Sequence, residues 1–206
     1  MLIVEHFFLI ACDPRAGLPT WPRRTQGAEQ LAAAALLLDL ATQGRLSLRH
    51  DLQLAADTRL PLTHPLLTDA LHAISAHPVA PQTALEQIAH KLHPLVEKVL
   101  DALFRRDLLH RNESRRWLLL RRVRYPLRSV QARNEAVASL RHAVHTDDVH
   151  GLALLLLSDL SGLLPNLLDA REHEIATRRL LALNDARAAR DETHAILARV
   201  RAALLG

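Results

Sequence analysis

Two stretches of the sequence are apolar on almost every helical face, and they constrain the fold more than any other feature. One is the run 31–38 inside a helix predicted over residues 28–43, and the other is a helix predicted over residues 149–164. A helix that is apolar all round is normally buried, because a surface helix keeps one polar face toward water. The sequence therefore predicts two helices at the centre of a helical bundle.

The composition favours helices throughout the chain. Leucine supplies 45 of the 206 residues, whereas isoleucine, valine and the aromatic residues are scarce. Leu and Ala are good helix formers, and β-branched and aromatic residues favour strands, so a large β-sandwich or barrel is excluded. The apolar content also excludes a disordered chain. Since no linker divides the sequence, residues 1–206 are predicted to form a single, mainly α domain.

Shorter elements are predicted from local patterns. Apolar residues three and four positions apart predict further helices, and Pro94 kinks or divides the one over residues 85–103. Asp169 with Glu172 resembles a capping box that opens a helix, and residues 2–11 form a short helix or a strand. Other helices are predicted over residues 65–76, over residues 127–144 and from near Asn184 onward.

Two small hairpins are predicted between these helices. Alternating leucines place the arms of the first at residues 46–48 and 52–54. The second has predicted arms at residues 108–111 and 116–123, with a turn at residues 112–114.

The sequence favours a cytoplasmic protein. The single cysteine, Cys12, excludes a disulfide framework, and its apolar neighbours favour a core cysteine over a nucleophile. The first residues lack the basic leader of a signal peptide. The longest apolar stretch, residues 151–164, is shorter than the roughly 20 residues that a membrane span requires. We therefore expect at most an association with the inner face of a membrane.

Positive charge is concentrated in one segment. The chain carries a net charge of +4, but residues 105–128 hold nine arginines against Asp107 and Glu113, a local excess of +7. Such a segment attracts anionic surfaces, and the planar guanidinium suits phosphate. The alternative is that the hairpin arginines merely form a solvated face and pair with acids elsewhere in the chain; they are Arg115, Arg116, Arg121, Arg122 and Arg124.

No catalytic or cofactor motif is present, so the predictions include no enzyme activity, no cofactor and no metal. Only six glycines occur, and none forms a phosphate-binding loop, a dinucleotide fingerprint or a nucleophile elbow. Asp159 lies inside an apolar helix, where an arginine or a helix-end amide is the expected partner. Histidines and acids also crowd one helix end, but 13 histidines make such a cluster expected by chance; its members are His142, His145, Asp147, Asp148 and His150.

Three stretches resemble the Golgi phosphoprotein 3 family, in particular its bacterial branch. They are ALLLDLATQGRLSL at residues 35–48, VLDALFRRDLLHRNESRRWLLLRRVRYPLRS at 99–129 and GLALLLLSDLSGLLPNLL at 151–168. The resemblance implies a central helical bundle ringed by amphipathic helices, with two short β-hairpins. It also implies a peripheral membrane protein, because eukaryotic members bind phosphatidylinositol 4-phosphate at the Golgi and help to retain glycosyltransferases.

The resemblance also implies a lipid site. Trp21 matches the family's loop tryptophan, whereas the family's basic positions fall at Ala33, His93 and Val96, of which two are apolar here. We therefore predict looser anion binding, in a headgroup pocket formed by Trp21, Arg23, Arg24, His93 and Lys98. The second hairpin, which the family uses for self-association and membrane contact, contributes Arg115, Arg116, Trp117, Arg121, Arg122 and Arg124. These groups are predicted to open onto a common side of the molecule.

The predicted function is a non-enzymatic, peripheral membrane-binding module. Its expected partners are anionic phospholipids or a phosphoinositide, cytosolic tails of membrane proteins, and a second copy bound through the second hairpin. One alternative is a winged-helix nucleic-acid binder, because a helix precedes an arginine-rich hairpin. Glu97 and Asp101 on that helix oppose phosphate, so we do not expect nucleic acid. The other alternative is a structural oligomerisation domain.

Overall fold

The fold is mainly α-helical, as the composition predicts. The computed structural model describes residues 1–13, 27–116, 120–183 and 191–206, with residues 114–116 and 120–122 described by their backbone alone. The helices are α1 (Ile3–Ala11), α2 (Ala28–Thr42), α3 (Pro65–Ala73), α4 (Pro81–Lys91), α5 (Leu95–Arg105), α6 (Val130–His142), α7 (Val149–Leu160), α8 (Ala170–Ala182), α9 (Glu192–Leu205) and a short 3-10 helix, η1 (Leu164–Asn166). The strands are β1 (Leu46–Leu48), β2 (Leu54–Ala56), β3 (Asn112–Arg116) and β4 (Leu120–Arg124).

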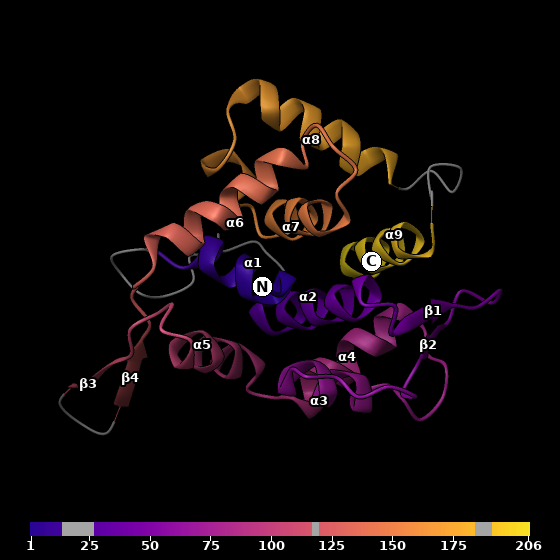
Figure 1. Ribbon diagram of the computed structural model, residues 1–206, viewed down its shortest axis with the longest axis horizontal. Helices are drawn as coiled ribbons and strands as arrows, with labels where there is room; N and C mark the ends of the chain where they lie inside the picture. Colours follow the sequence, from indigo (N-terminus) through magenta and orange to yellow (C-terminus); the bar gives the residue numbers. More distant parts are fainter. Residues whose placement is uncertain (14–26, 117–119, 184–190) are drawn as a thin grey trace.

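The core is built around α1, α2 and α7, which run through the middle of the molecule (Figure 1). Every residue of α2 from Leu31 to Ala41 is buried, and so is every residue of α7 from Gly151 to Ser158. Helices α3, α4 and α5 pack on one side of this layer, and α6 and α8 lie on the other (Figure 1). The prediction of two central apolar helices is therefore confirmed, and α1 is a third.

Side-chain caps explain where several helices begin. The predicted capping box is confirmed, because the Asp169 carboxylate accepts a hydrogen bond from the Glu172 amide and Glu172 accepts one from the Asp169 amide. Helix α9 begins at Glu192, and the predicted start near Asn184 lies outside the described residues. Asp191 supplies the cap there by accepting a bond from the His194 amide at 2.9 Å.

Pro94 divides the long amphipathic pattern into α4 and α5 rather than kinking one helix. It is the residue before the first turn of α5, where its missing amide hydrogen costs no helical bond. Helix α7 ends before the predicted limit, at Leu160, and Gly162 turns the chain with a φ of +70°, a left-handed conformation that glycine adopts readily.

The first hairpin is present, but its second arm is shifted. Leu48 pairs with Leu54 and Leu46 pairs with Ala56, so residues 52–54 do not form the predicted arm. Leu52 lies exposed in the turn with a φ of +64°, whereas Leu54 is buried and bonds to Val79. The alternation of Leu52 and Leu54 was misleading, because only Leu54 enters the core.

The second hairpin also differs from its predicted boundaries. Asn112 and Glu113 lie in β3, paired with Arg124 and Val123, so the predicted turn at residues 112–114 is wrong. Leu109, expected in the first arm, lies outside β3. It is fully buried and forms an isolated antiparallel β-bridge with Leu127. The burial of Leu109 just before β3 ends the match to the predicted arm, and hydrophobic alternation along the sequence does not reveal it.

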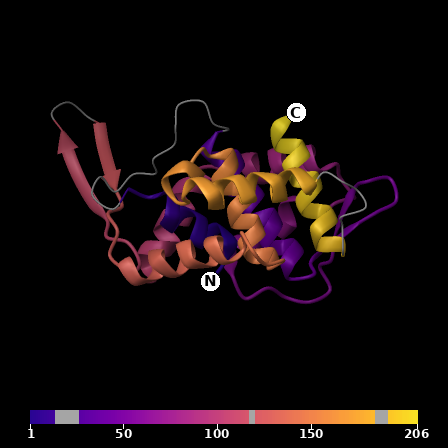
Figure 2. The same ribbon diagram turned by 90° about the horizontal axis from the view of Figure 1, so that it is seen from above.

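The two hairpins lie at opposite ends of the molecule. Figures 1 and 2 both show β3–β4 projecting from the helical body at one end, while β1–β2 lies at the other. The two arginine-bearing strands β3 and β4 therefore lie outside the helical body, where a large partner can reach them.

Gly151 permits the close approach of α6 and α7. A Cβ atom at this position would lie 2.5 Å from the Ala143 Cβ and 2.7 Å from the Ser139 carbonyl oxygen. We expect Gly151→Ala to lower the free energy of unfolding by about 1–3 kcal/mol, because overpacking outweighs the better helix propensity of alanine. Chemical denaturation measures the change.

The matched control is Gly27→Ala, where an added Cβ meets no atom within 4 Å. It should cost less than about 1 kcal/mol, since Gly27 is only a helix-cap residue. Equal losses in the two variants would contradict the assigned packing of α6 on α7.

Candidate functional site

The predicted headgroup residues fall into two groups. Trp21, Arg23 and Arg24 lie outside the described residues, as does Trp117 of the second hairpin. His93 and Lys98 are described, and they flank the start of α5. The site can therefore be built from the α4–α5 junction and from the hairpin.

The start of α5 is occupied by a carboxylate of the chain itself. Glu29, in the first turn of α2, accepts hydrogen bonds from the Leu95 amide at 2.8 Å and from the Val96 amide at 3.2 Å. His93 Nδ1 lies 3.9 Å from the Glu29 carboxylate, and its side chain is 71% exposed. The first amides of a helix are a natural anion site, and here an internal anion fills it. No local pattern indicates this contact, because the partners lie far apart along the chain.

Lys98 lines a shallow pocket to which His93 does not contribute. The pocket has a volume of about 270 Å³, and it is lined by Asp69, His72, Ala73, Lys91, Leu92 and Lys98. Lys91 Nζ donates to the Ala73 carbonyl oxygen at 2.6 Å, near the end of α3. Lys91 is thus a basic neighbour of Lys98 that was not among the predicted site residues.

Several arginines of the basic segment are paired with acids. Arg111 lies 3.4 Å from Asp101 and 3.1 Å from Glu113, and Arg128 forms an ion pair with Asp107. Arg106 forms one with Glu5. Glu5 and Asp101 lie outside residues 105–128, so their contacts reduce the excess of +7, in which Asp107 and Glu113 are already counted. These three arginines are not among the hairpin arginines for which internal pairing was the alternative.

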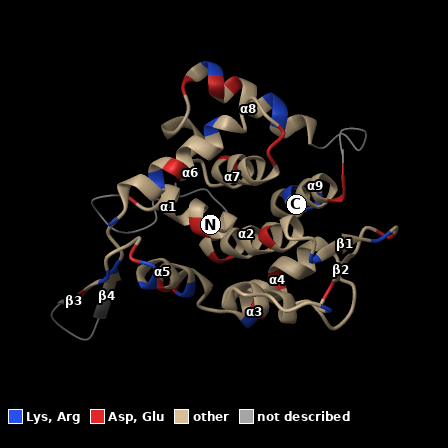
Figure 3. Ribbon diagram, in the orientation of Figure 1, with Lys and Arg blue, Asp and Glu red and all other residues tan. Residues whose placement is uncertain are grey.

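Other arginines of the segment remain available. Arg105 and Arg124 are exposed, and among the described residues neither forms an ion pair. The strand register places Arg115 opposite Arg121 along the backbone. Basic residues gather at the base of the hairpin and at the adjoining end of α5 (Figure 3).

A buried tyrosine fastens the hairpin to α5. The Tyr125 hydroxyl donates to Asp101 Oδ1 at 2.7 Å, and Asp101 also faces Arg111. Burial and the Asp101 carboxylate raise the pKa of Tyr125 well above its ordinary value, so the hydroxyl keeps its proton as a donor. Together with the Leu109–Leu127 bridge, this contact fixes where the ribbon leaves the body.

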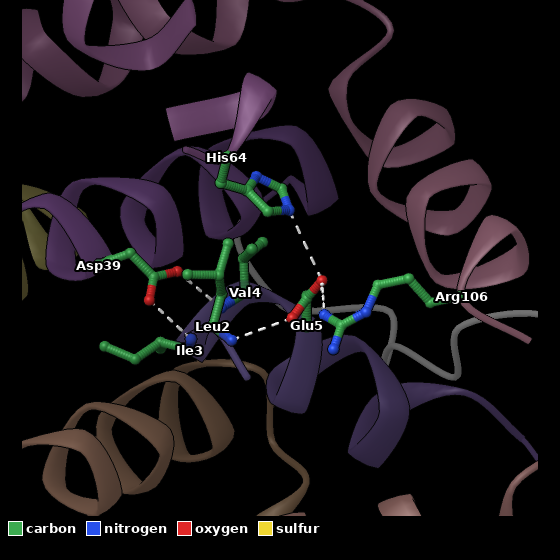
Figure 4. Close-up of polar contacts among 7 residues, drawn as sticks. All are labelled: Leu2, Ile3, Val4, Glu5, Asp39, His64 and Arg106. Carbon is green, nitrogen blue, oxygen red and sulfur yellow. Dashed lines mark hydrogen bonds and ion pairs between the residues drawn. The ribbon is translucent and has the colours of Figure 1, made fainter. Parts of the chain in front are cut away.

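Two buried carboxylates hold the start of α1 (Figure 4). Asp39 of α2 accepts hydrogen bonds from the Ile3 amide at 2.7 Å and from the Val4 amide at 3.0 Å. Glu5 accepts one from the Leu2 amide at 3.0 Å, pairs with Arg106, and lies 3.6 Å from His64 Nε2. Both acids are satisfied by donors of the chain, so they anchor α1 instead of facing a ligand.

Their pKa values move in opposite directions. Burial raises the pKa of Asp39 to about 7, against the two amide hydrogen bonds that lower it. Burial also raises the pKa of Glu5, but the bonds from His64, Arg106 and the Leu2 amide outweigh it and bring the pKa to about 2. The sequence analysis did not identify Glu5 or Asp39 as an anchor. The signal in each case was a charged residue inside an otherwise apolar helix.

His150 is paired with a distant histidine. His6 Nδ1 lies 2.9 Å from His150 Nε2, and the rings are nearly perpendicular. Burial lowers the pKa of both, that of His6 to about 4. Of the other members of the predicted cluster, Asp148 caps α7 through the Gly151 amide and Asp147 binds Arg179. Across the described ranges, no three His, Cys, Asp or Glu residues converge as a metal site would require.

Two further sequence predictions concern single residues. Cys12 is buried, and burial raises its pKa to about 12, as expected for a core cysteine. Asp159 is half-buried, and burial raises its pKa against the charges of Arg201 and His173. Arg201 contributes the larger of these two charge effects, but no ion pair among the described residues joins it to Asp159, so the expected partner stays a prediction.

The fold and the site together define a mainly α-helical protein with internally anchored core helices and an arginine-rich hairpin that projects from its body. A family model for Golgi phosphoprotein 3 (GPP34) matches residues 3–205. The chain therefore belongs to the Golgi phosphoprotein 3 family, as the three similar stretches predicted. None of the curated proteins compared with the chain matches it. Among the helices that the structure describes, none has both the length and the apolar character to cross a membrane.

Proposed function

We propose that the protein is a non-enzymatic module that docks reversibly on anionic membrane surfaces through the β3–β4 hairpin. The observation that carries the proposal is the projection of this arginine-rich ribbon from the end of the helical body (Figures 1 and 2). Membership of the Golgi phosphoprotein 3 family supports it, since the resemblance implies a peripheral membrane role.

The strength of the interaction follows from simple electrostatics. Each arginine near an anionic leaflet contributes on the order of 1 kcal/mol, and the attraction decays within a Debye length. Arg115, Arg116, Arg121, Arg122 and Arg124 lie on the two strands, while three nearby arginines are already paired with acids. Binding is therefore moderate and weakens as the salt concentration rises.

The contacts at the start of α5 argue against a pocket that recognises one lipid headgroup. They favour a general attraction between the arginines and the negative charge of the membrane. Glu29 already holds the Leu95 and Val96 amides, and it faces His93 with a negative charge. A phosphate group would meet this carboxylate before it reached the amides. Binding should thus follow the net negative charge of the bilayer, with little preference for phosphatidylinositol 4-phosphate over other anionic lipids of equal charge.

Vesicle flotation with charge-reversal variants tests the proposal. At low salt, wild type should float with vesicles that contain phosphatidylserine and not with neutral phosphatidylcholine vesicles. The double variant Arg121→Glu/Arg122→Glu should bind at least about tenfold more weakly, because it removes two attractive groups of about 1 kcal/mol each and adds repulsion.

The matched control is Arg171→Glu/Arg178→Glu, which makes the same change in charge on exposed positions of α8, away from the hairpin (Figure 1). It should retain most of the binding. Equal flotation with neutral and anionic vesicles at low salt would refute the proposal. A loss confined to Lys98→Glu would assign binding to the α4–α5 junction instead, and a gel shift of duplex DNA abolished by Arg121→Glu/Arg122→Glu would favour the nucleic-acid alternative.

A further inference from the structure

The hydrogen bond between His6 and His150 joins two helices that are far apart in the sequence. His6 lies on α1, and His150 is in the first turn of α7. The facing ring nitrogens, His6 Nδ1 and His150 Nε2, are 2.9 Å apart, and the rings are nearly perpendicular, with an interplanar angle of 86°. This distance is that of an N–H···N hydrogen bond, so a single hydrogen atom lies between the two nitrogens.

The geometry leaves no room for a second hydrogen between the rings. A neutral imidazole carries hydrogen on one of its two nitrogens, so in a neutral pair one facing nitrogen donates and the other accepts. A first additional proton enters at the outward nitrogen of the donating ring and leaves this hydrogen bond in place. A second proton has to enter at the accepting nitrogen, and two positively charged rings then point their N–H groups at each other. The contact cannot persist in that state.

We propose that the His6–His150 pair is an acid-sensitive joint, which holds α1 against α7 while at least one ring is neutral and opens when both rings are protonated. Helix α1 contributes the fully buried Phe7 and Phe8 to the core, so opening of the joint exposes apolar side chains. The joint is independent of the proposed membrane surface, since neither helix belongs to the arginine-rich hairpin.

Burial keeps the joint closed near neutral pH. Desolvation by burial lowers the pKa of His6 to about 4, and the charge of His150 lowers it further; burial also lowers the pKa of His150. The ordinary pKa of an imidazole is 6.5, so the open state takes up protons that the closed state refuses. The stability that the joint contributes is therefore complete above pH 6.5 and is lost as the pH falls toward 4.

The charges around the joint act in both directions. Three acids favour protonation of the rings, namely Glu5 on α1, Glu135 on α6 and Asp148 before α7, whereas the amino group of Met1 opposes it. The other helices packed on α1 and α7 bring charged groups that are engaged elsewhere: Arg106 of α5 and His64 contact Glu5, Asp39 of α2 binds the start of α1, and Arg201 of α9 and His173 of α8 act on Asp159 near the end of α7.

Proton NMR of the imidazole signals tests the protonation of the pair. In the folded protein the His6 signal should titrate near pH 4, and the His150 signal should titrate at a lower pH than it does in the urea-unfolded chain. The single variants His6→Gln and His150→Gln assign the two signals. Titration of both rings at the same pH in the folded and the unfolded chain would overturn the proposal.

Hydrogen exchange of the α1 amides measures the opening itself. From pH 6 to pH 5, the opening constant of wild type relative to His6→Gln/His150→Gln should rise at least about fivefold, because released rings gain protons. The ratio removes the contribution of Asp39, which is present in both proteins and acts in the opposite direction. If the double variant fails to fold, His150→Gln replaces it, since one ring alone cannot form the head-on contact, and the ratio should still rise as the pH falls.

The matched control is His142→Gln/His145→Gln, which removes two exposed histidines near the end of α6 and should keep the pH dependence of wild type. A ratio that stays constant between pH 6 and pH 5 would overturn the proposal. An equal loss of pH dependence in the control would place the effect near the end of α6 and overturn it as well.

Discussion

Replacing Arg106 with methionine is expected to lower the free energy of unfolding by about 3 kcal/mol. The change leaves the Glu5 carboxylate, which has no solvent exposure, without its guanidinium partner. Removing one member of a buried pair costs more than the pair itself contributes, because the remaining charge stays in a poorly solvated place. The partial exposure of Arg106 keeps the expected loss at the lower end of the range for such variants. Urea denaturation at pH 7 measures it.

The matched control is Arg128→Met, which removes an arginine from the exposed pair with Asp107. Both side chains of that pair are exposed to water, so the free energy of unfolding should fall by less than about 1 kcal/mol. A double variant, Glu5→Gln/Arg106→Met, should lose less than the sum of its single variants, because the two residues interact directly. Additive losses, or equal losses for Arg106→Met and Arg128→Met, would show that Glu5 is not a buried charge held by Arg106.

The second large effect concerns Asp39 and pH. Its pKa is about 7 in the folded protein against 3.8 ordinarily, so between these values the folded state holds a proton that the unfolded state has released. Stability must then fall as the pH rises through this window, by about 1.4 kcal/mol per unit and about 4 kcal/mol in total. Asp39→Asn removes this titration. Relative to the variant, wild type should therefore become less stable between pH 4 and pH 7.

The difference between wild type and Asp39→Asn is the quantity to measure, because other groups titrate nearby. The pKa of His6 is lowered to about 4, which acts in the opposite direction over much of the same window. The pKa of Glu5 falls from 4.5 to about 2, so its contribution is present above pH 4.5 and is lost as the pH falls toward 2. Asp69→Asn, an exposed carboxylate on α3, is the control and should follow wild type. A constant difference between wild type and Asp39→Asn from pH 4 to pH 7 would contradict the raised pKa.

The features that sequence analysis predicted well are local ones. The apolar runs that became α2 and α7 specify burial through their own side chains, and the Asp169–Glu172 box fixes a helix start within four residues. Pro94 separates α4 from α5 because its ring excludes a continuous helix. Each of these signals acts over one or two helical turns, so no knowledge of the tertiary fold is needed.

The features that sequence analysis missed depend on contacts between distant segments. Glu29 reaches the start of α5, Asp39 reaches the start of α1, and His6 meets His150 across 144 positions of sequence separation. None of these residues carries a local pattern that identifies its partner. The shifted hairpin arms have a related cause, since burial of Leu54 and Leu109 by other elements decides which leucines enter the strands.

The carboxylate of Glu29 acts as a tethered ligand for the first amides of α5. A group attached to the same molecule competes at an effective concentration in the millimolar range or above, whatever the concentration of protein. An outside phosphate, whether dissolved or on a lipid, must therefore compete with a partner that is always present. The first turn of α5 is closed to outside anions as long as α2 and α5 stay packed together.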